Sequence, residues 1–380
     1  MTLDVGSSRQ HDVTLTWSDP ERGRPALDVL VRLLALTDYA QDRGDLAPYL
    51  MEPAGDRQWT WTARLPADLR TSYQLCAARD DPVPRRALGD DEWLSLVAEG
   101  VADPAASDVL PPGCVFGSPQ ERASVLSLPD ALAQPWRERR PSVPQGSLER
   151  LEIGSGTTAS IVHVYRAPGA DAATDVALAI LFDGGTLLDI DIAATFDNLV
   201  HEQAVEPLVA VLVESIRGSA RRGPTRVQSL TAPGVFESFV IEELTPVLVD
   251  RLPITDDPSR SAVVGQSLGG LAALWLAHRH PGRFGCAVAQ SSSLWWPGGD
   301  GQLSGDDVLA AYAGSVPPVR LFVEAGSEET DVLSSNRRLR AVLSDVGGSA
   351  AYREFRGGHD YACWRGGIAD GLIATFGTAR

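Results

Sequence analysis

Apolar and polar residues alternate in the first hundred residues of the chain. Val13–Trp17 and Trp59–Leu65 place an apolar side chain at every second position, and Leu27–Leu36 is a longer apolar run. Clusters of Pro, Asp and Gly separate these segments, as is typical of antiparallel strands joined by turns. This pattern predicts an all-β sandwich domain over residues 1–102.

The next stretch, residues 103–147, differs in composition. Eight of its residues are proline, which resists regular secondary structure and stiffens a chain. We therefore predict a linker that packs along the surface between two domains.

From residue 148 onward, apolar runs of strand length alternate with segments of helical character. Continuous apolar runs are typical of parallel strands, which are buried on both faces, and strands that alternate with helices predict an α/β domain. We expect a mostly parallel sheet flanked by helices over residues 148–380. The predicted elements are, in order, Ile161–Tyr165, Val176–Phe182, Phe196–His201, Leu208–Ser215, Phe236–Leu252, Ser261–Val264, Leu271–Ala277, Gly285–Gln290, Val319–Glu324, Asn336–Leu343 and Ala351–Phe355.

A Gly-x-Ser-x-Gly motif joins one of these strands to the following helix. Gly265 and Gly269 allow the strand and the helix to approach at a sharp turn. Such a turn holds the Ser267 hydroxyl above the carboxyl edge of the sheet, and it presents the N–H of Leu268, at a helix N-terminus, to an oxyanion. The alternative interpretation is a Gly-rich turn that only packs.

A second pair of glycines follows the predicted strand Val176–Phe182. Because Gly184 and Gly185 have no side chains, their N–H groups are free to face a ligand, and this turn is a further candidate for an oxyanion site. An ordinary strand-to-helix turn explains the same residues equally well.

Acidic residues and a histidine follow the last two strands. Glu328 and Glu329 come after Val319–Glu324, and His359 follows Ala351–Phe355 behind two glycines. The order Ser, acid, His along the chain is that of α/β-hydrolases, in which the histidine takes the serine proton and the carboxylate orients its ring. The pattern predicts a serine hydrolase, with either glutamate as the acid.

Composition restricts the partners of the chain. The net charge of −17 argues against nucleic-acid binding, which needs a basic surface. The sequence has no apolar run of about 18 residues, so no membrane span is predicted. The N-terminus lacks a signal-peptide pattern, so we expect reduced cysteines and a cytoplasmic location. No Cys-x-x-Cys pair predicts a metal site, and no cofactor is expected.

Two features are candidates for ligand contacts. The chain has no lysine, and Arg226 lies with three further arginines in the predicted loop 216–228, which follows a strand and so reaches the ligand edge of the sheet. Trp295 and Trp296 are adjacent in a loop after another strand and predict an aromatic wall. Solvated arginines, and core packing of one tryptophan, are the alternatives.

Several segments resemble the enterochelin (enterobactin) esterases. The resemblance rests above all on residues 357–367, Gly-Gly-His-Asp-x-x-Cys-Trp-Arg-Gly-Gly, on residues 290–297, Gln-Ser-x-Ser-x-Trp-Trp-Pro, and on residues 265–271 around the serine. Weaker similarity extends through the first domain, so nearly the whole chain is involved.

The resemblance implies an esterase-D-like α/β-hydrolase domain behind an N-terminal β-sandwich. It also implies hydrolysis of the trilactone backbone of a catecholate siderophore such as enterobactin, in ferric or iron-free form, with release of iron inside the cell. The matching positions imply Ser267 as nucleophile and His359 as base. The family pattern Ala-Gly-x-x-Glu aligns Glu329 as acid, with Glu328 as the fallback.

A siderophore substrate agrees with the candidate ligand contacts. A ferric triscatecholate is an aromatic trianion, so Arg226 and Arg365 would offset its charge and Trp295 and Trp296 would face its rings. Two departures stand out: the family segment Arg-x-x-Glu-Leu reads Arg-Val-Gln-Ser-Leu here, and a nearby Asn is Pro233. The pocket is therefore expected to accept a different or modified trilactone.

Two other functions stay open from the residues. The first is an α/β-hydrolase that acts on other esters, of the feruloyl or thioester type; the N-terminal domain and the Trp-Trp-Pro loop argue against it. The second is a siderophore-binding protein without catalysis, against which the complete Ser–acid–His set argues. The siderophore is the one predicted partner, and the sequence leaves the oligomeric state open.

Overall fold

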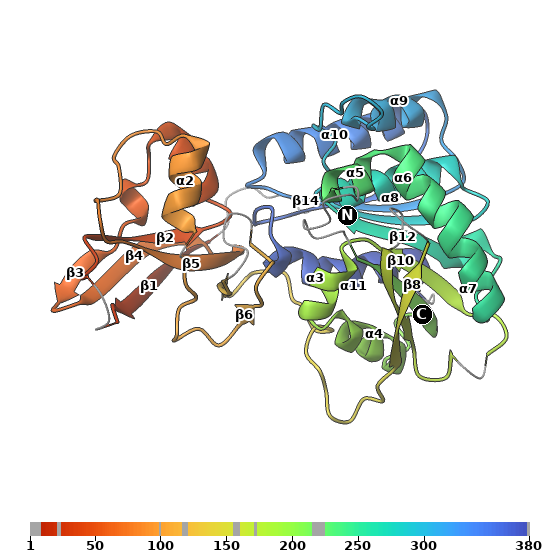
Figure 1. Cartoon of the computed structure of the whole chain (residues 1–380), viewed down its shortest axis with the longest axis horizontal. Helices are drawn as coiled ribbons and strands as arrows, with labels where there is room; N and C mark the ends of the chain where they lie inside the picture. Colours follow the sequence, from red (N-terminus) through yellow and green to blue (C-terminus); the bar gives the residue numbers. More distant parts are fainter. Residues whose placement is uncertain are drawn as a thin grey trace.

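Two antiparallel sheets form the N-terminal part of the protein (Figure 1). The computed structural model describes residues 9–20, 24–98, 100–115, 121–154, 160–170, 173–214 and 225–377. One sheet has the strand order β1-β4-β3 and the other β2-β5-β7-β6. Their strands are β1 (Gln10–Ser18), β2 (Asp28–Leu33), β3 (Glu52–Gly55), β4 (Gln58–Pro66), β5 (Arg70–Ala78), β6 (Val109–Leu110) and β7 (Ala123–Ser127).

The core of this domain lies between the two sheets. Trp17 and Trp61 of the first sheet share a buried cluster with Val31 and Leu75 of the second. Apolar side chains of both sheets thus face each other, which confirms the β-sandwich that the alternation predicted. Short helices complete the domain, namely α1 (Thr37–Ala40), η1 (Gln41–Arg43), η2 (Ala47–Tyr49) and α2 (Asp90–Val97).

Two strands fall inside the stretch predicted to be a linker. β7 pairs with β5, from Arg70 opposite Ser127 to Tyr73 opposite Ser124, and β6 pairs with β7. The structure thus assigns these strands to the N-terminal sheet rather than to a linker. β7 itself contains no proline, so all of its residues have an N–H with which to join the ladder.

An eight-stranded sheet forms the second domain, with the order β15-β14-β13-β12-β10-β11-β9-β8. The strands from β15 to β11 run parallel, and β9 and β8 are antiparallel at one edge. The carboxyl ends of the parallel strands therefore meet at one edge of the sheet. The strands are β8 (Ser147–Ile153), β9 (Ser160–Arg166), β10 (Ala177–Leu181), β11 (Leu208–Val213), β12 (Ser261–Gln266), β13 (Cys286–Gln290), β14 (Arg320–Gly326) and β15 (Ala351–Phe355).

Helices cover both faces of this sheet (Figure 1). α8, α9 and α10 pack together on one face, and α11 packs with α4 on the other. This arrangement confirms the α/β-hydrolase fold. The helices are α3 (Gly184–Asp189), α4 (Ile192–His201), α5 (Arg226–Thr231), α6 (Pro233–Ser238), η5 (Phe239–Leu244), α7 (Thr245–Arg251), η6 (Pro258–Arg260), α8 (Leu268–Arg279), α9 (Gly305–Gly314), α10 (Thr330–Asp345) and α11 (Tyr361–Phe376).

The single long helix predicted over Phe236–Leu252 is divided into α6, the π-helical turn η5 and α7. Pro246 has no N–H with which to continue the α-helical ladder. Just before it, both the backbone N–H and the hydroxyl of Thr245 donate to the carbonyl of Val240, five residues earlier, which is the bonding of a π-helical turn.

Candidate active site

The turn between β12 and α8 holds Ser267 in a strained conformation. Its φ is +58° and its ψ is −122°, a region that residues other than glycine rarely occupy. A Cβ at Gly265 would lie 2.2 Å from the backbone of Gly269, so glycine is required where strand and helix meet. The sequence motif therefore produces the sharp turn that exposes a nucleophile at the end of a strand.

The Ser267 hydroxyl lies beside a serine of the next loop. Its Oγ is 3.1 Å from the Oγ of Ser293, and its backbone N–H donates to the carbonyl of Gln290 over 3.0 Å. Among the described residues, no hydrogen bond joins Ser267 to His359. Catalytic hydrogen bonds are often long before substrate binds, so His359 stays the candidate base for Ser267.

His359 and Glu329 form an ion-pair-like contact at the same edge of the sheet. The Nδ1 of His359 lies 2.6 Å from Glu329 Oε1, and the Glu329 side chain is fully buried. The second carboxylate oxygen accepts hydrogen bonds from the Ser291 hydroxyl, over 2.7 Å, and from the N–H of Gly326. Three donors thus stabilise one buried carboxylate and fix its direction.

Glu328 faces a different partner. Its carboxylate accepts from the guanidinium of Arg356 over 2.9 Å, and its backbone N–H donates to the carbonyl of Gly357. A Cβ at Gly326 would lie 2.3 Å from that same carbonyl, so the glycine lets the segment after β14 approach the segment that carries the histidine. The geometry pairs the imidazole with Glu329.

The three N–H groups predicted for an oxyanion site begin two helices. Leu268 is the first residue of α8, and Gly184 and Gly185 are the first residues of α3. The first N–H groups of a helix have no acceptor within it. A Cβ on Gly269 would touch Phe182 and lie 3.7 Å from Asp183, so the turn after β10 packs against the turn that carries Ser267.

Arg226 is paired with the turn that carries these glycines. Its Nε and one terminal nitrogen donate to the two carboxylate oxygens of Asp183, over 2.8 and 2.7 Å. Burial by itself would lower the pKa of the guanidinium, but the charge and hydrogen bonds of Asp183 raise it above its ordinary value. The Arg226 side chain is 40% exposed, so it supports the turn and still presents a cation at the surface.

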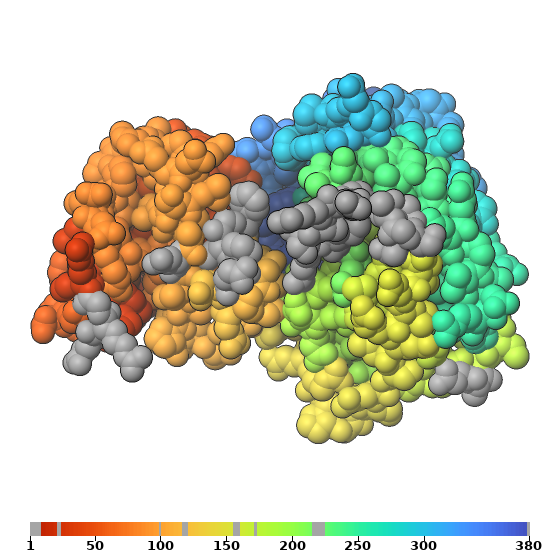
Figure 2. All heavy atoms as spheres, in the orientation of Figure 1, coloured from red at the N-terminus to blue at the C-terminus, as the bar shows by residue number. Residues whose placement is uncertain are grey.

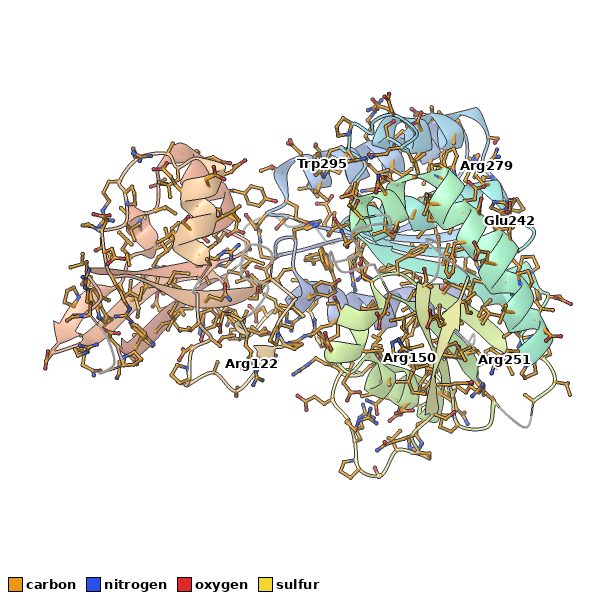
Figure 3. All side chains as sticks on the ribbon, in the orientation of Figure 1. Arg122, Arg150, Glu242, Arg251, Arg279 and Trp295 are labelled. Carbon is orange, nitrogen blue, oxygen red and sulfur yellow. The ribbon has the colours of Figure 1, made fainter. Side chains whose placement is uncertain are left out.

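The two adjacent tryptophans differ in exposure. Trp295 is 49% exposed, and in Figure 3 it lies on the side of the hydrolase domain toward the N-terminal domain. Trp296 packs against the core of the domain, and the two rings meet edge to face with centroids 6.1 Å apart. Trp295 is thus available to a ligand, whereas core packing accounts for Trp296.

Arg365 has an environment unlike that expected of a substrate contact. It is buried, and its guanidinium donates to both oxygens of Asp108 and to the side chain of Gln134. Both partners precede the hydrolase sheet in the chain, so Arg365 joins the two parts of the protein. Contrary to the prediction, Arg365 thus binds Asp108 and Gln134 rather than facing a substrate.

Four further residues lie near the site, and the sequence motifs predicted no role for them. Ser291 and Ser293 follow β13, and the ring of Trp364 meets that of His359 edge to face at 4.6 Å. Tyr39 comes from the N-terminal domain; burial raises the pKa of its phenol, and the charge of Glu329 raises it further. Ser291, Ser293 and Trp364 lie in the family-like segments 290–297 and 357–367. Tyr39 lies in neither segment, and no sequence motif around it points to the site.

Ser291 connects Trp364 to the carboxylate of Glu329, and its hydroxyl is expected to stabilise the protein. It accepts from the indole N–H over 2.9 Å while donating to Glu329. In Ser291→Ala, two buried polar groups lose a partner, and we expect the free energy of unfolding to fall by about 1–3 kcal/mol. Urea denaturation measures this change. Ser334→Ala, at an exposed position of α10, is the control, and equal stability of the two variants would contradict the assigned network.

Arg217, Arg221 and Arg222 lie outside the described residues. Over the part of the chain that the structure describes, no group of three His, Cys, Asp or Glu side chains is placed to hold a metal ion. Within the same residues, no helix is long and apolar enough to cross a bilayer.

Comparison with known proteins divides the chain in the same way. A family model described as putative esterase matches residues 161–375, and one described as enterochelin esterase, N-terminal, matches residues 12–137. The chain is 32% identical over 375 residues to the iron(III) enterobactin esterase of Escherichia coli (strain K12), with 95% of this chain and 90% of that protein covered.

Solved structures agree with these matches. The enterobactin esterase of Shigella flexneri, determined in the presence of enterobactin, superposes with a TM-score of 0.80 at 30% identity and covers 96% of this chain and 92% of its own. The ferric enterobactin esterase of Salmonella typhimurium gives a TM-score of 0.82 at 30% identity, with 96% and 93% covered. Both domains of this protein are therefore similar to those of one group of esterases.

Proposed function

This chain belongs to the enterochelin (enterobactin) esterase family, and we propose that it is a serine esterase that hydrolyses the trilactone backbone of a catecholate siderophore. The observation that carries the proposal is the contact between His359 and buried Glu329, at the sheet edge where the strained turn presents Ser267. Whole-length similarity to iron(III) enterobactin esterases supplies the substrate class.

The proposed reaction begins with attack of Ser267 on one ester carbonyl of the ring. His359 takes the hydroxyl proton through Nε2, while Glu329 holds Nδ1–H and stabilises the resulting imidazolium. The carbonyl oxygen becomes an oxyanion, which the N–H groups of Leu268, Gly184 and Gly185 are positioned to stabilise. The imidazolium then protonates the departing alcohol.

Water completes the proposed reaction. His359 takes a proton from water, the hydroxide attacks the acyl group on Ser267, and the serine leaves with that proton. Each cycle therefore opens one ester with one water molecule. A ring of three esters offers three such cycles, and its catecholates lose their hold on the ferric ion as they separate.

The surface around the site suits an aromatic anion. Trp295 is exposed toward the N-terminal domain, and Arg226 presents a cation beside the oxyanion turn. Figure 2 shows the surface indented where the N-terminal domain meets the hydrolase domain. These contacts support a catecholate whose rings and charge face the junction. Ser229 stands where the family has glutamate, so a modified trilactone is within the proposal.

Arg226→Ala is expected to weaken binding of the ferric siderophore more than of the iron-free form. The substitution removes a cation and, with it, the two hydrogen bonds that Arg226 donates to the carboxylate of Asp183, so a negative charge loses this cation beside a trianion. We expect a KM about tenfold higher for the ferric form, or about 1.4 kcal/mol. Arg251→Ala is the control, because Arg251 pairs with Glu149 and lies far from the N-terminal domain in Figure 3. An unchanged ferric KM would remove Arg226 from the substrate contacts.

Chromatography of ferric and iron-free enterobactin tests the proposed function. Both forms are incubated with the protein and with Ser267→Ala, and the linear trimer, dimer and monomer are quantified. Cleavage by the parent protein and none by the variant is the expected result. If neither form is cleaved while simple esters are turned over with Ser267, the enzyme class stands and the siderophore substrate is wrong.

The cytoplasm is the proposed location of this reaction. None of the four cysteines, all within the described residues, forms a disulfide, which is expected where thiols are kept reduced. Iron released in that compartment is directly available to the cell. Cleavage activity in the soluble fraction of gently lysed cells, and none after osmotic shock alone, would agree with this location.

A further inference from the structure

The segment that carries His359 is held from two sides. On one side lies Glu329; on the other lies the N-terminal domain, through β5 and the turn after β2. A Cβ at Gly358 would lie 2.7 Å from the Cα of Ala35, and the N–H of Arg70 donates to the carbonyl of Arg356 over 3.0 Å. The N-terminal domain therefore touches the residues immediately before the histidine.

The residue after the histidine makes the most specific of these contacts. Asp360 is fully buried, and one of its carboxylate oxygens accepts from the backbone N–H of Ser72 and, over 3.3 Å, from the Thr71 hydroxyl. The other oxygen caps α11 by accepting from the N–H of Ala362 over 2.8 Å. Burial raises the pKa of this carboxyl, and the donated hydrogen bonds oppose the shift.

Thr71 is itself fixed within the N-terminal sheet. Its hydroxyl accepts from the N–H of Ala35 over 3.1 Å, and its one proton is shared between two acceptors, the carbonyl of Ser72 at 3.0 Å and the Asp360 carboxylate at 3.3 Å. It is fully buried on β5. The Asp360 carboxylate is therefore held by a buried strand of the sandwich.

We propose that Thr71 and Ser72 of the N-terminal domain are positioning residues, which hold His359 in place through Asp360. These hydrogen bonds fix the residue after the histidine and so restrain the backbone from which the His359 side chain extends. Catalysis by a triad depends on such placement, since displacements near 1 Å cost about 10²-fold in rate. The inference rests on the proposed role of His359 as the base.

The N-terminal domain of an esterase can act in two ways, by contacting the substrate or by positioning the catalytic base, and these predict different results. A domain that only contacts the substrate affects large siderophores and leaves small esters untouched. A domain that positions the base affects every ester, whatever its size. p-Nitrophenyl acetate is too small to bridge the two domains, so its turnover reports on the catalytic residues and not on substrate contacts with the N-terminal domain.

The test compares Thr71→Val with Tyr73→Phe. Both remove a buried hydroxyl from β5, but the Tyr73 hydroxyl donates to Asp103, over 2.8 Å, and not to Asp360. We expect Thr71→Val to lower kcat about tenfold on p-nitrophenyl acetate and on the trilactone alike, with KM for the acetate unchanged. Both substitutions are expected to lower the thermal midpoint of unfolding by similar amounts. Only Tyr73→Phe is expected to leave kcat at the parent value.

A second variant and a second readout complete the test. Asp360→Ser keeps a side chain that caps α11 but is too short to reach β5, and it is expected to lower kcat as Thr71→Val does. The low-field proton resonance of His359 Nδ1–H, assigned with His359→Gln, is expected to broaden in both variants. This signal requires no turnover, so it decides the inference even if the proposed esterase function fails.

Two results would overturn the inference. One is a loss of kcat in Thr71→Val and Asp360→Ser that is confined to the trilactone, while turnover of p-nitrophenyl acetate and the low-field resonance stay as in the parent. The other is an equal loss of kcat in Tyr73→Phe, which would mean that general loosening of the N-terminal domain is responsible.

Discussion

Replacing Ser267 with alanine is expected to lower hydrolysis of the trilactone by a factor on the order of 10⁶. The turn between β12 and α8 positions a single hydroxyl over the sheet edge, and alanine has no atom with which to form the acyl intermediate. The measurement is kcat for the parent and the variant on enterobactin and on p-nitrophenyl acetate. Residual activity would come from binding and the oxyanion N–H groups alone.

Ser292→Ala is the matched control for this substitution. Ser292 lies in the loop beside Ser267 and is buried, and its hydroxyl has no hydrogen-bond partner among the described residues. Its loss is expected to leave turnover near the parent value. Substantial turnover by Ser267→Ala, with the protein folded, would instead show that another residue attacks the ester.

Glu329→Gln is expected to reduce kcat by about 10⁴, whereas Glu328→Gln is expected to leave it nearly unchanged. An amide at residue 329 keeps the shape of the side chain but no longer orients and stabilises the protonated imidazole of His359, 2.6 Å away. Glu328 pairs with Arg356 instead. The comparison uses kcat on both substrates, with circular dichroism spectra to establish that each variant is folded.

The two glutamates are adjacent, so each controls for the other. Equal losses in both variants would indicate that the segment after β14 has been disturbed rather than the acid removed. A large loss in Glu328→Gln alone would overturn the assignment of Glu329 that the hydrogen bonds support. The predicted order of activity is therefore parent, then Glu328→Gln, then Glu329→Gln.

Much of the site could be predicted because its determinants are local. The sharp turn at Ser267 requires glycine at residue 265, where a Cβ would meet the backbone of Gly269, and both glycines stand in the motif. The positions of Gly184, Glu329 and His359 at strand ends follow from the alternation of strands and helices, since parallel strands bring their carboxyl ends together. Family resemblance then selected one of two adjacent glutamates, and the structure pairs that residue with the histidine.

The contacts between the two domains could not be predicted in this way. Arg365 was expected at the substrate, and its guanidinium is instead paired with Asp108, more than 250 residues earlier in the chain. The strand β7 lay within a proline-rich stretch whose composition predicted a linker, and pairing with β5 makes it part of the sandwich. In both cases the partner, and not the local pattern, decides what the residue does.

The sequence by itself therefore determined the strand–turn–helix that carries Ser267, the α/β class, the β-sandwich and the order of the catalytic residues. These follow from steric limits at glycine and from the periodicity of apolar side chains, which act over a few residues. Only the tertiary structure decided which charges are paired, which tryptophan is exposed and what holds His359. Hydrogen bonds such as Thr71 to Asp360 join residues 289 positions apart, and no local pattern encodes such a partner.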